Sequence, residues 1–92
     1  MDSKTLDSLG ALALDLKRVS LGLQRGSISM AERFMQEAMA RKKEIKKESV
    51  DKYVLRLLSK MEESFKTSDN SKKADDALMY STLFQNASLK RK

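Results

Sequence analysis

The strongest constraint in this sequence is the spacing of its apolar residues between positions 50 and 65. They recur at intervals of three and four residues, as Val50, Tyr53, Val54, Leu57, Leu58, Met61 and Phe65. Helical residues three and four apart are neighbours on one face, so this spacing predicts an amphipathic helix over residues 50–66. Ser49 is the expected N-cap, because a short polar side chain can accept a hydrogen bond from the first turn.

Three further segments, at 4–25, 30–46 and 72–89, show helical spacing. The segment 4–25 has a main apolar stripe at Leu9, Leu12, Leu16, Val19 and Leu23 and a second stripe at Leu14 and Leu21. A helix that is apolar on two faces is typical of a central position in a bundle. Ser71 is the expected cap of the segment 72–89.

Local signals also mark the ends of the first two helices. Asp2 or Ser3 can cap the first helix, and Gly26 stands where a left-handed residue closes many helices. Ser29 followed by Glu32 matches a capping box, which predicts the start of the second helix.

The boundary between the second and third helices has no glycine or proline. Extending the apolar face of Ala31, Phe34 and Ala38 by helical steps reaches Glu48 rather than Val50. The two stripes are therefore out of phase, which predicts a break. A single continuous helix is the alternative.

Composition supports an all-α fold. The chain has no proline and three glycines in 92 residues, and strong helix formers dominate it. We predict one helical domain over residues 1–92, with a frayed tail at 90–92. Short loops favour a small four-helix antiparallel bundle. The alternative is a three-helix core with one helix extended toward a partner.

The residue types present argue against an enzyme or a cofactor site. The chain has no histidine and no cysteine, which excludes the usual zinc ligands, a thiol nucleophile and a base that titrates near neutral pH. We expect no catalytic, cofactor or metal site and no small-molecule substrate. The most apolar stretch contains Asp15, Lys17 and Arg18, so we expect no membrane span. With no signal peptide evident, we expect a cytoplasmic protein.

Methionine is frequent, with six in the chain. Methionine side chains adapt their shape and are common on surfaces that accommodate partners. A cluster on the second helix, together with the second stripe of the first, forms the candidate protein-interaction set: Leu14, Leu21, Met30, Phe34, Met35 and Met39. These residues predict a protein-protein interaction or self-association module whose partner is itself or another protein. Filling of core gaps is the competing interpretation of the methionines.

The net charge of +6 raises nucleic acid as an alternative partner. The candidate phosphate contacts are Arg41, Lys42, Lys43, Lys46, Lys47, Lys90, Arg91 and Lys92. A small basic nucleic-acid-binding or regulatory protein is therefore the second functional hypothesis, although it is not favoured. The positive excess is spread over the chain, and cations at helix C-termini complement the helix dipole. Spacing also predicts local ion pairs of Glu37 with Arg41 and Glu62 with Lys66.

Overall fold

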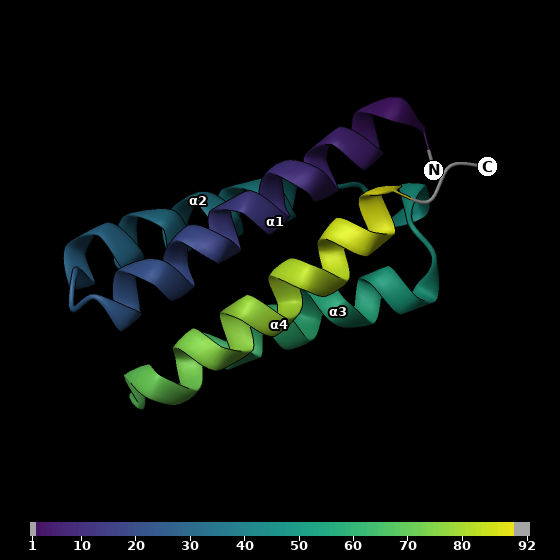
Figure 1. Ribbon diagram of the computed structural model, residues 1–92. Helices are drawn as coiled ribbons and strands as arrows, with labels where there is room; N and C mark the ends of the chain where they lie inside the picture. The colour runs from purple at the N-terminus through teal and green to yellow at the C-terminus, as the bar shows by residue number, and fades with distance from the viewer. Residues whose placement is uncertain (1, 90–92) are drawn as a thin grey trace.

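The computed structural model describes residues 2–89, and these residues are all-α (Figure 1). The four α-helices are α1 (Ser3–Gln24), α2 (Ile28–Glu44), α3 (Lys52–Ser64) and α4 (Asn70–Leu89), with a short 3-10 helix, η1 (Lys47–Ser49), before α3. The predicted fold class is confirmed, and the helix bounds differ from the predicted ones by one or two residues. Within residues 2–89, no helix is both long and apolar enough to cross a membrane.

Successive helices run antiparallel, and α1 packs extensively on both α2 and α4 (Figure 1). Ser81 in α4 donates a hydrogen bond of 2.7 Å to the carbonyl of Ala13 in α1. Lys42 in α2 reaches Glu62 in α3 with an N–O distance of 3.0 Å. The arrangement is therefore an up-down bundle in which α1 is the best-covered helix.

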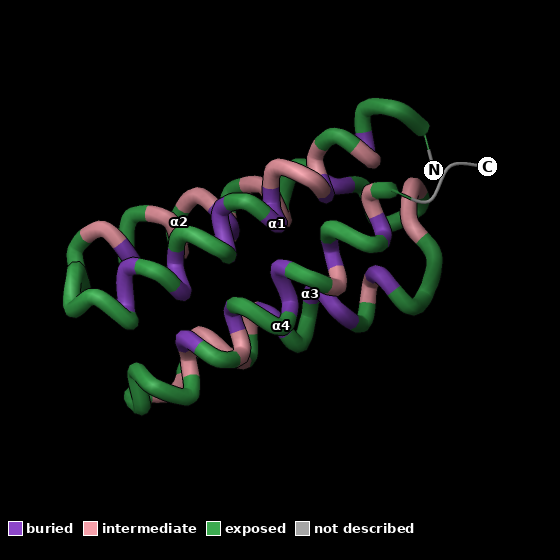
Figure 2. Tube along the Cα trace, viewed as in Figure 1, coloured by how far each residue is buried: buried purple, intermediate pink, exposed green. Residues whose placement is uncertain are grey.

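The main stripe of α1 is buried as predicted, and buried positions recur on the inward side of each α-helix (Figure 2). Leu9, Leu12 and Leu16 have no exposed surface. The second stripe is not covered: Leu14 is 48% exposed and Leu21 is 36% exposed. The other helices of the same chain therefore do not use this part of α1.

The turn between α1 and α2 is closed by backbone hydrogen bonds. Gly26 has a φ of +77°, as expected for a left-handed cap residue. The N–H of Ser27 donates to the carbonyl of Gly22 at 2.8 Å, and α2 begins at the next residue. The predicted capping box of Ser29 and Glu32 is wrong, because this tight turn starts the helix earlier and places both residues inside it.

Carboxylates cap the other three α-helices. Each accepts a hydrogen bond from the backbone N–H three residues later, at 2.8 Å for Asp2, 2.9 Å for Asp51 and 3.1 Å for Asp69. The predicted cap at Asp2 is confirmed. Ser49 and Ser71 were the wrong choices, since an aspartate nearby adds a negative charge at the positive end of the helix dipole.

The predicted break between α2 and α3 is present. The backbone is extended at Ile45 and Lys46, turns once through η1, and is extended again at Val50. Ile45 is 8% exposed and joins the core. The two apolar stripes can therefore both face inward, although they are out of phase along the sequence.

α3 is the shortest α-helix, with 13 residues against 22, 17 and 20 in α1, α2 and α4. All four α-helices contribute to one core cluster. A second cluster contains residues of α1, α2 and α4 alone: Val19, Leu23, Ala31, Ala74 and Ala77. The bundle therefore has four helices at one end and three at the other.

A buried ion pair joins α1 to α2. Asp15 is 3% exposed, and its Oδ2 lies 2.9 Å from Nε of Arg41. The predicted local pairing of Glu37 with Arg41 is wrong, and Glu37 pairs instead with Arg33 at 3.5 Å. Arg41 turns inward because an unpaired buried carboxylate is costly.

Replacing Arg41→Ala is expected to destabilise the protein by about 2 kcal/mol, because Asp15 then stays buried without its partner. The free energy of unfolding in urea measures the change. Lys66→Ala is the control, since it breaks an exposed pair with Glu63 and should cost less than about 0.5 kcal/mol. Equal losses in the two variants would contradict a structural role for the buried pair.

Two glycines of α1 are expected to respond in opposite ways to alanine. A Cβ at Gly22 would lie 3.1 Å from the backbone nitrogen of Ala31, whereas a Cβ at Gly10 has nothing nearer than 3.7 Å. Gly10→Ala should stabilise the protein by about 0.5–1 kcal/mol through helix propensity. Gly22→Ala should destabilise it by about 1 kcal/mol, because α2 must move away. Thermal unfolding distinguishes the two, and a stabilised Gly22→Ala variant would contradict close α1–α2 contact.

Candidate protein-interaction groove

The N-terminal part of α2 extends beyond the end of α3. Lys42 and Glu62 form an ion pair across the two helices, so they lie at the same level of the bundle. α3 continues for only two residues past Glu62 and ends at Ser64. Met35 lies seven residues before Lys42, which is about 10 Å along α2. The side of α2 that faces α3 is therefore uncovered from Met35 toward its N-terminus.

An apolar groove lies at this point. Ile28, Met35 and Met39 share one side of α2, since their spacings of seven and four residues are helical repeats. Phe65, at the end of α3, meets this side. The groove has a volume of about 350 Å³ and is lined by Met35, Gln36, Met39, Ala40, Lys43 and Phe65. We call it the α2 groove.

The exposure of the lining residues suits a binding surface on a stable fold. Met35, Met39 and Phe65 are half-buried, and each packs partly on one of the two core clusters. Gln36 and Ala40 are exposed at the rim. The apolar side chains are thus held in place by the core while one side of each stays open.

Ion pairs neutralise most charges near the α2 groove. Lys42 donates a hydrogen bond to Glu62 and thereby holds the pKa of that carboxyl below its ordinary value. Lys66 pairs with Glu63 at 3.7 Å, so the predicted pairing of Glu62 with Lys66 is wrong. Lys43 also lines the groove, and it forms no ion pair within the described part of the chain.

The six predicted interaction residues lie in three places. Met35 and Met39 line the α2 groove. Phe34 lies on the α1 side of α2, where the guanidinium carbons of Arg18 and Arg33 are 5.3 and 5.8 Å from its ring centre. The remaining three belong to α1 or its contact with α2: Met30 packs near Gly22, and Leu14 and Leu21 are exposed. The sequence analysis missed Gln36, Ala40, Lys43 and Phe65 as groove residues.

The basic residues proposed as phosphate contacts also separate. Arg41 and Lys42 bind carboxylates, while Lys43 lies in the α2 groove. Lys47 lines a shallow hollow beside Leu58. The remaining candidates at 90–92 (Lys90, Arg91 and Lys92) lie outside the described residues.

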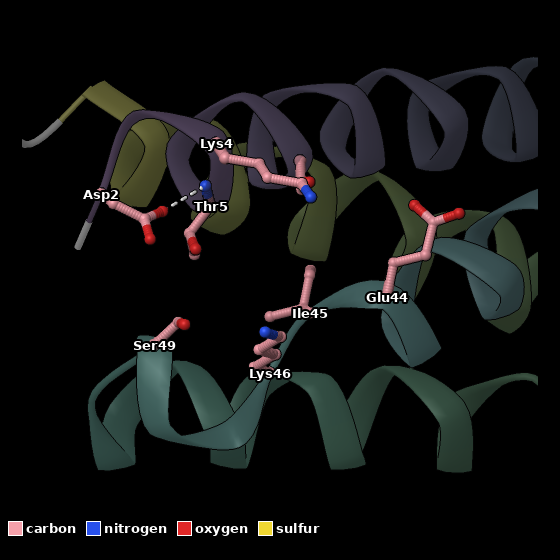
Figure 3. A pocket seen from close by; sticks show the side chains of 8 residues that line it. Asp2, Lys4, Thr5, Glu44, Ile45, Lys46 and Ser49 are labelled. Carbon is pink, nitrogen blue, oxygen red and sulfur yellow. Dashed lines mark hydrogen bonds between the residues drawn. The ribbon is translucent and has the colours of Figure 1, made fainter.

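Lys46 lines a larger hollow of about 510 Å³ at the four-helix end of the bundle (Figure 3). Lys4 and Lys46 share it with Asp2 and Glu44, so its charges balance. Asp2 is already used as a helix cap, as the dashed line to Thr5 shows (Figure 3). Among residues 2–89, no three acidic side chains come together as metal ligands would. This hollow therefore has no convergent set of ligands.

Comparison with known proteins gives no match to a protein family, a curated protein or a solved structure. The geometry and charge of the α2 groove are therefore the basis for a functional proposal.

The ion pair beside the groove gives a prediction for pH. Because Lys42 lowers the pKa of Glu62, the pair stabilises the fold above the pKa of the unfolded chain, and this contribution is lost as pH falls through the folded pKa. In Lys42→Met, the pKa of Glu62 should rise toward its ordinary value. Carboxyl NMR titration measures it, with Lys60→Met as a control that leaves it low. An unchanged pKa in Lys42→Met would contradict the pairing.

Proposed function

We propose that this protein is a non-catalytic interaction module that binds a helical segment of another protein along the α2 groove. One observation supports this above the others: α3 ends early and leaves an apolar side of α2 without a covering helix. Grooves of this kind bind amphipathic helices through side chains spaced three and four residues apart. A partner helix would occupy the position that additional turns of α3 would otherwise fill.

The composition of the groove supports the same proposal. Its methionines can adjust to the shape of a partner's side chains, and Phe65 supplies a rigid aromatic surface. Gln36 and Lys43 at the edge give polar contacts that fix the orientation of a bound helix. This combination of apolar centre and polar rim is typical of protein interfaces.

A partner other than a second copy fits the groove better. A symmetric dimer would place the same surface of both copies together, and two grooves facing each other would leave the space between them unfilled. We therefore propose binding to a different protein. The absence of cysteine fits a reducing compartment, so we propose that binding takes place in the cytosol.

Selection of helical peptides displayed on phage tests this function without assuming a partner. Peptides enriched on the folded protein should lose about tenfold in affinity, or about 1.4 kcal/mol, for Met39→Gln. The loss follows from removal of apolar contact at the centre of the groove. Met79→Gln is the matched control, because Met79 is a methionine of α4 that is 47% exposed. Its affinity should stay unchanged.

A second variant protects this test against misfolding. Ala40 is an exposed groove residue, so Ala40→Gln should narrow the groove and weaken the same peptides without loss of stability. Thermal unfolding checks that each variant is folded. Failure to enrich any peptide, or peptides that bind both Met39→Gln and Ala40→Gln normally, would refute the proposal. Light scattering that shows a dimer broken by Ala40→Gln would replace it with self-association.

A further inference from the structure

We infer that the occupant of the α2 groove is an acidic amphipathic helix, whose apolar face packs on the methionines and whose carboxylates meet lysines at the groove. This inference rests on the proposed function and specifies the chemistry of the partner. The evidence is the set of charges that the fold leaves unpaired around the uncovered part of α2.

Lys43 is the first of these charges. It is exposed and lines the α2 groove. The neighbouring Lys42 already occupies Glu62, and Lys66 occupies Glu63, at distances of 3.0 and 3.7 Å. No carboxylate lies within 4.0 Å of Lys43 among the residues that the structure describes. Its ammonium group is therefore available to a bound anion.

Lys73 is the second, and it lies on α4. It shares an inward face with the buried Ala77 and Tyr80, since it precedes them by four and seven residues, and it is itself half-buried. Tyr80 lines a hollow together with Lys60 of α3, so Lys73, two turns before Tyr80, lies beyond the end of α3 at Ser64. It forms no ion pair within residues 2–89.

These two lysines come from the two helices between which additional turns of α3 would lie. Glu32 is an exposed acidic residue on the same side of α2, one turn before Met35. Lys43 and Lys73 together exceed its charge, so the uncovered corner has a positive excess. A helix with carboxylates beside its apolar face would match both the apolar strip and these cations.

The uncovered strip also sets the length of the occupant. From Ile28 to Met39 there are eleven residue steps, which correspond to about 16 Å at about 1.5 Å per residue. A helix of about three turns covers this distance. Nucleic acid would satisfy the lysines but would leave Ile28, Met35 and Met39 without apolar contact, so we favour a peptide.

Three synthetic peptides of about 14 residues test the inference, since this length gives about four turns. They share leucines at helical spacing, and their other positions are glutamate, glutamine or lysine. Heteronuclear NMR titration of the intact protein gives each dissociation constant. At low salt the glutamate peptide should bind about fivefold tighter than the glutamine peptide, and the lysine peptide should bind most weakly. The difference should shrink at high salt, because ions screen exposed charges.

Variants of the protein assign the charge preference to particular residues. Lys43→Gln and Lys73→Gln should each weaken the glutamate peptide about two- to threefold, and Glu32→Gln should strengthen it about twofold. Lys17→Gln is the matched control, because Lys17 is exposed on α1 and removes the same charge. Its affinity should stay unchanged.

The outcomes separate this inference from the proposed function. If the glutamine peptide binds as tightly as the glutamate peptide, or if Lys17→Gln weakens binding as much as Lys43→Gln, the acidic preference is refuted while groove binding stands. A short DNA duplex that displaces the glutamate peptide and depends on Lys43 would assign the cations to nucleic acid and overturn the inference. If no peptide shifts the resonances of the α2 groove, both proposals fail.

Discussion

The structure depends on how closely α1 approaches its two neighbours. Gly22 lets the backbone of α2 come within van der Waals distance of α1, since even a Cβ there would lie 3.1 Å from the nitrogen of Ala31. On the other side, Ser81 of α4 is near enough to donate a hydrogen bond to the backbone of α1. Small residues at these contacts hold three helices together. The alanines of the second core cluster extend this close packing to the open end of the bundle.

This close three-helix packing explains how the bundle tolerates a short α3. At the open end, Val19, Leu23 and the alanines of α2 and α4 already bury one another, so a fourth helix is not needed for the core. The cost appears on α2, where Met35 and Met39 remain half-buried. A fold that closes its core with three helices and stops the fourth early produces a groove without an unstable cavity, and the groove is therefore compatible with a stable unbound protein.

Features determined by neighbouring residues were predictable from the sequence. The apolar repeat of α3, the cap at Asp2 and the left-handed Gly26 all involve residues within a few positions of each other. Contacts between helices were not predictable in this way. Spacing paired Glu62 with Lys66, but the bundle brings Lys42 to Glu62 instead. The methionines at 35 and 39 drew attention to the groove, whereas Lys43 and Phe65 were missed because the early end of α3 brings them together.

Ion pairing in this fold selects which cations remain available. The basic run at residues 41–43 looks uniform in sequence, but consecutive residues point in directions about 100° apart on a helix. Arg41 faces Asp15 on α1, and Lys42 faces Glu62 on α3. Lys43, one step further round, meets no carboxylate and lies in the apolar groove. A basic run thus becomes one cation at a defined position, and a single cation beside an apolar strip is better suited to an amphipathic helix than to a phosphate backbone.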